Sequence, residues 1–165
     1  MRKLKLETQV ILAGMLGITC LAAPPAEKGK LRGPLPDEQR AIIQTLAKDH
    51  KKLTRKVELI DKGYVATTTS EDKQISEKLK AHFRYMKKRL DSGAMVRRWD
   101  PAYAEMTDYY DKLEVKVEEL PNGLKVTILG KTPEAVKVAR NHASIVTKFV
   151  KEGEAEVQKK HSKAN

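Results

Sequence analysis

The hydrophobic residues of this chain change their spacing in the same order twice. Along residues 37–93, apolar positions recur every three or four residues, then every second residue over two short segments, and then every three or four residues again. The same succession returns over residues 101–153. Spacings of three and four residues indicate amphipathic helices, and alternation indicates half-buried strands. The pattern therefore predicts helix–strand–strand–helix, written twice.

In the first copy, Asp37 stands where it can cap a helix, and Asp61-Lys62-Gly63 forms a turn signal between two short strands. Ser70 is the expected cap of the next helix, which Gly93 ends. The apolar stripe of that helix consists of Ile75, Leu79, His82, Phe83, Met86 and Leu90.

In the second copy, Asp100-Pro101 is a strong helix start, because a capping residue precedes a proline in the first turn. Residues 113–120 alternate, Pro121-Asn122-Gly123 turns the chain, and Thr132-Pro133 starts the last helix. Its apolar stripe consists of Val138, Ala139, His142, Ile145, Val146 and Phe149.

Residues 41–93 and 101–153 match at a constant offset of sixty positions without a gap. The recurring pairs include Lys52/Lys112, Leu53/Leu113, Lys56/Lys116, Val57/Val117, Glu58/Glu118, Gly63/Gly123, Thr67/Thr127, His82/His142, Lys88/Lys148 and Gly93/Gly153. Duplicated units commonly pack about a pseudo-twofold axis. We therefore predict an α+β fold, a tandem αββα repeat in one domain over residues 37–153. Its antiparallel sheet has about four strands, with helices packed on one face.

The N-terminus predicts export. Basic residues precede the apolar run 10–23, which is too short to span a bilayer, so residues 1–22 form a signal peptide. The alternative is a lipoprotein signal ending at Cys20, which would anchor the chain to a membrane. Residues 23–36, rich in proline and glycine, form a flexible linker, and the charged tail 154–165 is expected to fray. We expect a periplasmic or secreted bacterial protein.

The composition narrows the classes of partner. The formal net charge is +11, and removal of residues 1–22 leaves about +9. An exported basic protein favours an acidic protein or an anionic envelope surface over nucleic acid. A solvated surface of interleaved charges accounts for the same composition. The chain has one cysteine, Cys20, so the mature form has no disulfide and no thiolate metal site. The sequence also carries none of the common catalytic motifs, which favours a non-catalytic protein.

Three histidines lie on apolar stripes, where they are candidate metal or haem ligands. Neutral imidazoles from two related helices can ligate haem iron axially or hold copper. His82 and His142 are the candidate direct ligands, Met86 lies one turn after His82, and His50 is auxiliary. Tyr110 takes the place of His50 in the second copy, so a site would be asymmetric. The alternative is that these histidines are structural and bind backbone or carboxylate groups.

A second candidate site lies between the copies, where Trp99 follows Arg97 and Arg98. Two guanidinium groups beside an indole can bind a carboxylate, a phosphate or a haem propionate. The alternative is that Trp99 fills a hydrophobic gap while an arginine bridges the two copies.

Three motifs resemble a family of small, uncharacterised exported bacterial proteins. They are the Val-Arg-x-Trp-Asp-Pro joint over residues 96–101, the His-x-x-x-Met helix of His82 and Met86, and the helix from His142 to Gly153. The resemblance covers about four-fifths of the mature chain. It implies a shared fold and export, and it transfers no activity.

Together these observations support two hypotheses of function. The first is an exported ligand-binding protein that holds haem or a copper-type metal through His82 and His142. The second is an interaction module of the cell envelope, with structural histidines and a basic surface for an acidic partner. An exported enzyme ranks third.

Overall fold

The computed structural model describes Leu31 and residues 33–165. The predicted signal peptide, with Cys20, and most of the linker lie outside these residues. The described chain forms α1 (Asp37–Lys48), the 3₁₀ turn η1 (His50–Lys52), β1 (Thr54–Ile60), β2 (Gly63–Thr69), α2 (Lys73–Asp91), α3 (Pro101–Asp108), the 3₁₀ turn η2 (Tyr110–Lys112), β3 (Leu113–Leu120), β4 (Gly123–Gly130), α4 (Pro133–Glu152) and α5 (Glu154–Val157). None of the described helices has both the length and the apolar character needed to cross a membrane.

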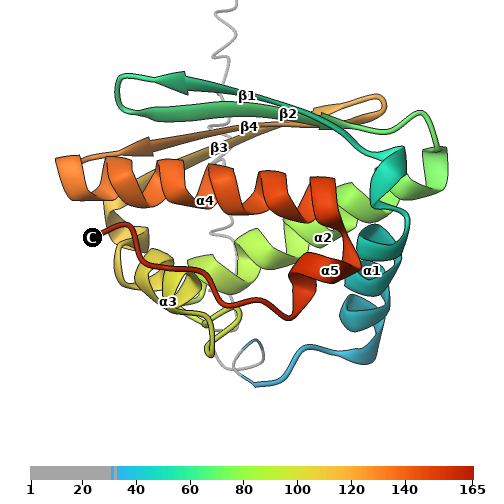
Figure 1. Ribbon diagram of the computed structural model, residues 1–165, viewed down its shortest axis with the longest axis horizontal. Helices are drawn as coiled ribbons and strands as arrows, with labels where there is room; N and C mark the ends of the chain where they lie inside the picture. The colour runs from blue at the N-terminus through green and yellow to red at the C-terminus, as the bar shows by residue number, and fades with distance from the viewer. Residues whose placement is uncertain (1–30, 32) are drawn as a thin grey trace, which may run out of the picture.

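The four strands form one antiparallel sheet in the order β1-β2-β4-β3. All the helices lie on one face of this sheet (Figure 1). Two long helices, α2 and α4, lie beneath the strands, and α1, α3 and α5 lie farther from the sheet. The predicted α+β class, four-stranded sheet and one-sided helix layer are confirmed.

The register of the sheet relates the two copies by a pseudo-twofold axis. Ala66 of β2 pairs directly with Val126 of β4, its own counterpart at the sixty-residue offset. Gly63 and Gly123 show the same symmetry. A Cβ on Gly63 would lie 1.9 Å from the carbonyl oxygen of Ile128, and one on Gly123 would lie 2.1 Å from that of Thr68. Each recurring glycine therefore permits close contact with the other copy.

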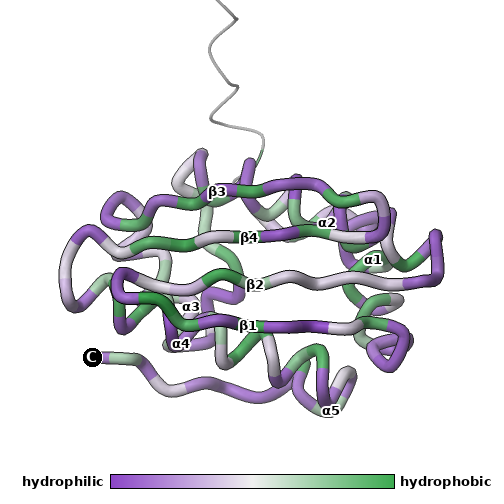
Figure 2. Tube along the Cα trace, turned by 90° about the horizontal axis from the view of Figure 1, so that it is seen from above, coloured by the Kyte–Doolittle hydropathy of each residue, from purple (hydrophilic) through white to green (hydrophobic). Residues whose placement is uncertain are grey.

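The core lies between the sheet and the long helices. Tyr64, Ala66, Leu124, Val126 and Ile128 point toward the helices and are buried. The opposite face of the sheet is open, and Figure 2 shows the four strands side by side on this face. Its charged side chains are exposed and balanced in sign, namely Lys56, Lys116, Lys125, Glu58, Glu114 and Glu118. The open face is therefore not the source of the basic character of the chain.

Side-chain caps start the helices on which the candidate residues lie. Thr132 caps α4 by accepting a hydrogen bond from the backbone N–H of Ala135, and Asp100 caps α3 as predicted. The prediction for α2 was wrong by two residues. Asp72 caps this helix, and its carboxylate accepts from the N–H groups of residues 74 and 75. Ser70 instead accepts a hydrogen bond from the N–H of Asp72 and stabilises the turn before the helix.

Candidate functional site

His82 and His142 occupy equivalent positions in α2 and α4, and both side chains are half-buried. Burial lowers the pKa of each to about 4, so both rings are neutral at pH 7. The ring of His142 meets Tyr103 of α3 edge-on, with centroids 5.7 Å apart. The Nδ1 atom of His82 is buried and has no hydrogen-bond partner among the described residues. Both rings are thus in the neutral form that metals bind.

His50 has a structural contact at the end of α4. Its Nδ1 donates a hydrogen bond of 2.9 Å to the carbonyl oxygen of Val150, one of the free acceptors in the last helical turn. Gly153 adjoins the same ring, and a Cβ there would lie 2.2 Å from Cδ2 of His50. In the other copy, the hydroxyl of Tyr110 donates to Asp91 at the end of α2, at 2.7 Å. The two positions therefore perform the same task with different chemistry.

The described residues contain no group of three or more His, Cys, Asp and Glu side chains placed to hold a metal ion. Met86 is half-buried on α2, one turn after His82. A site built on the predicted residues would therefore rely on imidazoles and a thioether.

The Arg97 guanidinium is held by contacts within the chain. It donates to Asp100 at 3.3 Å and to the carbonyl oxygens of Val157 and Lys159 at 2.9 and 3.0 Å. Its Cζ lies 4.3 Å from the ring centroid of Trp99. Arg97 also adopts a φ of +49°, a conformation that L-residues rarely adopt. Arg98 and Trp99 are exposed, and Trp99 retains 46% of its accessible surface.

Sequence reasoning missed a buried network around His161. Its Nδ1 lies 2.6 Å from Asp100, and its Nε2 lies 3.1 Å from Glu156. Both contacts are hydrogen bonds to ionised carboxylates only when the imidazole is protonated on both nitrogens. Burial by itself would raise the pKa of Asp100, but hydrogen bonds from His161 and the charge of Arg97 keep it below its ordinary value. A hydrogen bond from Lys159 lowers the pKa of Glu156.

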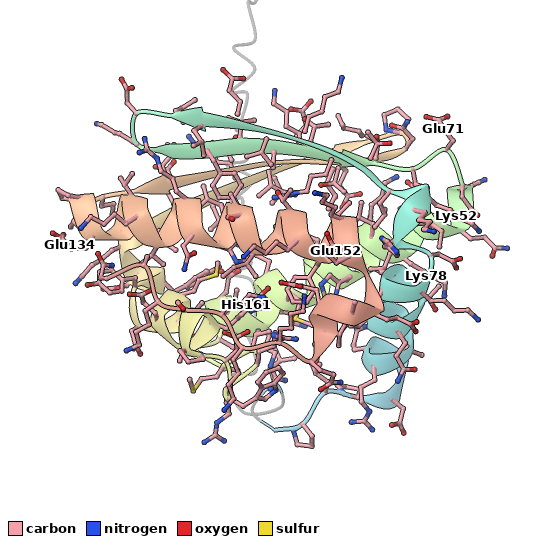
Figure 3. All side chains as sticks on the ribbon, in the orientation of Figure 1. Lys52, Glu71, Lys78, Glu134, Glu152 and His161 are labelled. Atoms are coloured by element: carbon pink, nitrogen blue, oxygen red, sulfur yellow. The ribbon has the colours of Figure 1, made fainter. Side chains whose placement is uncertain are left out.

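The C-terminal segment, residues 158–165, is bound along its length, whereas a frayed tail was predicted. Asn141 of α4 donates to the carbonyl oxygen of Ser162 at 2.9 Å. The buried carboxylate of Glu105 accepts from the backbone N–H groups of Ala164 and Asn165, at 2.7 and 3.1 Å. The segment lies below α4 on the side away from the sheet, where His161 is labelled in Figure 3. The spacing of charges gave no signal for this, because the buried partners Asp100 and Glu105 lie about sixty residues away in sequence.

A basic cleft of about 590 Å³ lies between α4 and the C-terminal segment. Five lysines and two glutamates are among its lining residues, namely Lys148, Lys151, Lys159, Lys160, Lys163, Glu152 and Glu156. Glu156 already binds Lys159 at 2.6 Å and faces His161. The cleft therefore has a net positive charge, and among the described residues Lys159 is the one lysine of the five that forms an ion pair.

Comparisons of the chain with models of known protein families, with curated proteins and with solved structures produced no match.

Proposed function

We propose that this chain is an exported interaction protein of the cell envelope, which binds an extended anionic partner in the basic cleft. The main support for this proposal is the cleft itself. Its lysines come from two elements, with Lys148 on α4 and Lys160 on the C-terminal segment, so they surround a concavity rather than form a line. A concave cationic surface concentrates anionic ligands and accelerates their association. A polyanion or an acidic peptide segment fits such a cleft better than a flat bilayer does.

Many of the other candidate groups already bind partners within the chain, so they are less available to an external partner than the lysines of the cleft are. The guanidinium of Arg97 binds Asp100 and two backbone carbonyl groups, and His50 binds the end of α4. The charged side chains of the open sheet face are balanced. The lysines of the cleft exceed the carboxylates beside them.

Two triple variants of equal charge test the proposal. The first replaces Lys148, Lys160 and Lys163 with glutamine, and the control makes the same change at Lys56, Lys116 and Lys125 on the open face. Heparin-agarose serves as the polyanion probe, and elution is followed in a salt gradient. We expect the cleft variant to elute at clearly lower salt than the control. Equal shifts would mean that net charge alone governs binding, and the proposal would be wrong.

The predicted export is tested separately, by fractionation of cells that express the whole chain. We expect mature protein in the periplasm or the medium, shortened by about the length of the signal peptide. A Cys20→Ser variant distinguishes a lipid-anchored form, since only that form would leave the membrane fraction on substitution. Full-length protein that stays in the cytoplasm would contradict the proposal.

A second candidate function is binding of haem or copper through His82 and His142, with Met86 as a further ligand. One observation favours it, the buried Nδ1 of His82, which has no hydrogen-bond partner within the part of the chain that the structure describes. A buried polar atom of this kind is costly unless something satisfies it. The test is reconstitution with haem or Cu(I), followed by an absorption spectrum and metal analysis. A Soret band or stoichiometric copper that is lost in His82→Leu supports this function, and absence of both rejects it.

A further inference from the structure

Arg55 of β1 places a cation between the sheet and α4. Its side chain lies on the helix-facing side of the strand, because Arg55 pairs with the buried Thr68 in the sheet. One terminal nitrogen donates to the Thr68 hydroxyl at 2.8 Å, and Nε donates to the Thr147 hydroxyl at 3.3 Å. Among the residues that the structure describes, its guanidinium forms no ion pair with a carboxylate. Within this described part of the chain, the hydrogen-bond partners of the cation are neutral hydroxyl groups.

The groups around Arg55 are also neutral and polar. Tyr64 of β2 adjoins it, and burial raises the pKa of this phenol to about 12. Tyr103 of α3 is close to both, and burial raises its pKa as well. Burial and, second, the charge of Arg55 lower the pKa of His142. At neutral pH the cluster thus consists of one guanidinium, two phenols and one neutral imidazole.

The other half of the molecule provides an internal comparison. At the sixty-residue offset, Arg55 corresponds to Val115, Tyr64 to Leu124 and Thr68 to Ile128. Tyr103 corresponds to Ile43, and only the histidine recurs, as His82. The equivalent place therefore packs with aliphatic side chains around one imidazole. The duplicated frame, meaning the two αββα units that share one sheet, does not require a guanidinium or phenols there. Their presence in one copy therefore needs a separate reason.

A partly buried guanidinium without a counter-ion is costly. It stays charged at neutral pH, and removal from water costs several kcal/mol unless an opposite charge compensates. Among the described residues, two of its five N–H donors bind the threonine hydroxyls, and the Tyr64 phenol is a further hydrogen-bond partner. The Tyr103 phenol and the His142 imidazole lie nearby as further hydrogen-bonding groups. Val57 and Leu59 lie on the same face of β1 and are 37% and 61% exposed. The cluster thus adjoins an apolar surface open to solvent.

We propose that Arg55, Tyr103 and His142 form a binding site for a small oxyanion, a carboxylate or a phosphate, entered between β1 and α4. The guanidinium supplies the charge and a fork of donors that matches an oxyanion. The Tyr103 hydroxyl and an imidazole N–H add neutral donors. Exposed Val57 and Leu59 favour a carboxylate that carries an apolar group. This site is separate from the basic cleft and uses none of its lysines.

The test is titration of the purified chain with octanoate, acetate and inorganic phosphate at constant ionic strength, followed by calorimetry and by the urea midpoint. We expect saturable binding, tightest for octanoate, and a midpoint that rises with ligand. Arg55→Met should weaken binding by about tenfold or more, since a charged hydrogen-bonding partner is lost. Lys56→Met, on the open face of the same strand, removes the same charge and should bind like the wild type.

A further variant covers the case in which Arg55→Met fails to fold. Tyr103→Phe keeps the ring and removes only the hydroxyl, and we expect it to fold and to bind several-fold more weakly. The proposal is wrong if none of the three anions binds saturably. It is also wrong if Arg55→Met and Tyr103→Phe both bind like the wild type. Tighter binding of phosphate than of octanoate would overturn the preference for an apolar group.

Discussion

Acidification from pH 7.5 to 5.0 should destabilise this fold through His82 and His142. Burial lowers the pKa of both to about 4, whereas an unfolded histidine has a pKa of about 6.5. Between these values the unfolded chain binds protons that the folded chain excludes. The stability that the two neutral histidines contribute is therefore fully present above about pH 6.5, and it decreases as the pH falls toward 4.

The size of the effect follows from the same values. For one group with folded and unfolded pKa values of about 4 and 6.5, the linkage relation gives a loss of about 2 kcal/mol by pH 5.0. Two such groups give about 4 kcal/mol, a large part of the stability of a small domain. Both histidines keep some contact with solvent, so these figures are upper values. Carboxylates add little above pH 5, because their unfolded pKa values lie near 4.

Urea unfolding followed by circular dichroism, at several pH values and constant ionic strength, measures this slope. We expect His82→Leu and His142→Leu each to remove about half of it, and the double variant to abolish most of it. Phe83→Leu is the control, because it removes packing on α2 beside His82 without removing a titrating group. It should lower stability at every pH and leave the slope unchanged. A wild-type slope that persists in the double variant would refute the reasoning.

Two further predictions concern the frame and the C-terminal segment. Gly63→Ala and Gly123→Ala should each lower the free energy of unfolding by about 2 kcal/mol or more, because the added Cβ would lie 1.9 or 2.1 Å from a carbonyl oxygen of the other copy. Gly93 has a φ of +72°, and a Cβ added there would meet no other heavy atom within 4 Å. In the same urea assay, Gly93→Ala should therefore lower the free energy of unfolding by only about 1 kcal/mol. Equal losses at all three positions would contradict the close-contact explanation. Deletion of residues 161–165 should cost about 2 to 4 kcal/mol and speed hydrogen exchange in α3, because Asp100 loses its bonds to His161 and Glu105 loses its two backbone N–H donors. Unchanged exchange in α3 would mean that the segment is not a stabilising element.

Local spacing was sufficient to predict the frame. Alternation over residues 113–120 and the turn at Pro121-Asn122-Gly123 depend on neighbouring residues, and both correspond to observed elements. The duplication then constrained the topology, because one sheet shared by two equivalent hairpins allows Ala66 and Val126 to pair on the axis. The α2 cap was misplaced because Ser70 and Asp72 are both capping residues, and only the backbone geometry selects between them.

The candidate site was harder to predict because its contacts join distant residues. Sixty-one positions separate Asp100 from His161, and ninety-two separate Arg55 from Thr147. No spacing rule connects such pairs, and His161 stands in a charged tail with no apolar pattern around it. One usable signal was present. Arg55 stands in a strand position whose counterpart is Val115, so the comparison of the copies marks it as unusual.

Comparison of the two copies also distinguishes residues that the fold explains from residues that need another explanation. A residue that recurs at a frame position, such as Gly63 and Gly123, is explained by contacts that both copies make. The recurring histidines are neutral and half-buried in both copies, so their recurrence by itself does not distinguish packed side chains from ligands. Residues that break the symmetry at a cost in desolvation, above all Arg55, need a cause outside the frame. A variant that restores the symmetry, Arg55→Val, should therefore fold at least as stably as the wild type if the guanidinium serves a ligand. It should be clearly less stable if the two threonine hydrogen bonds are the reason for the arginine, and urea unfolding without added anion distinguishes these outcomes.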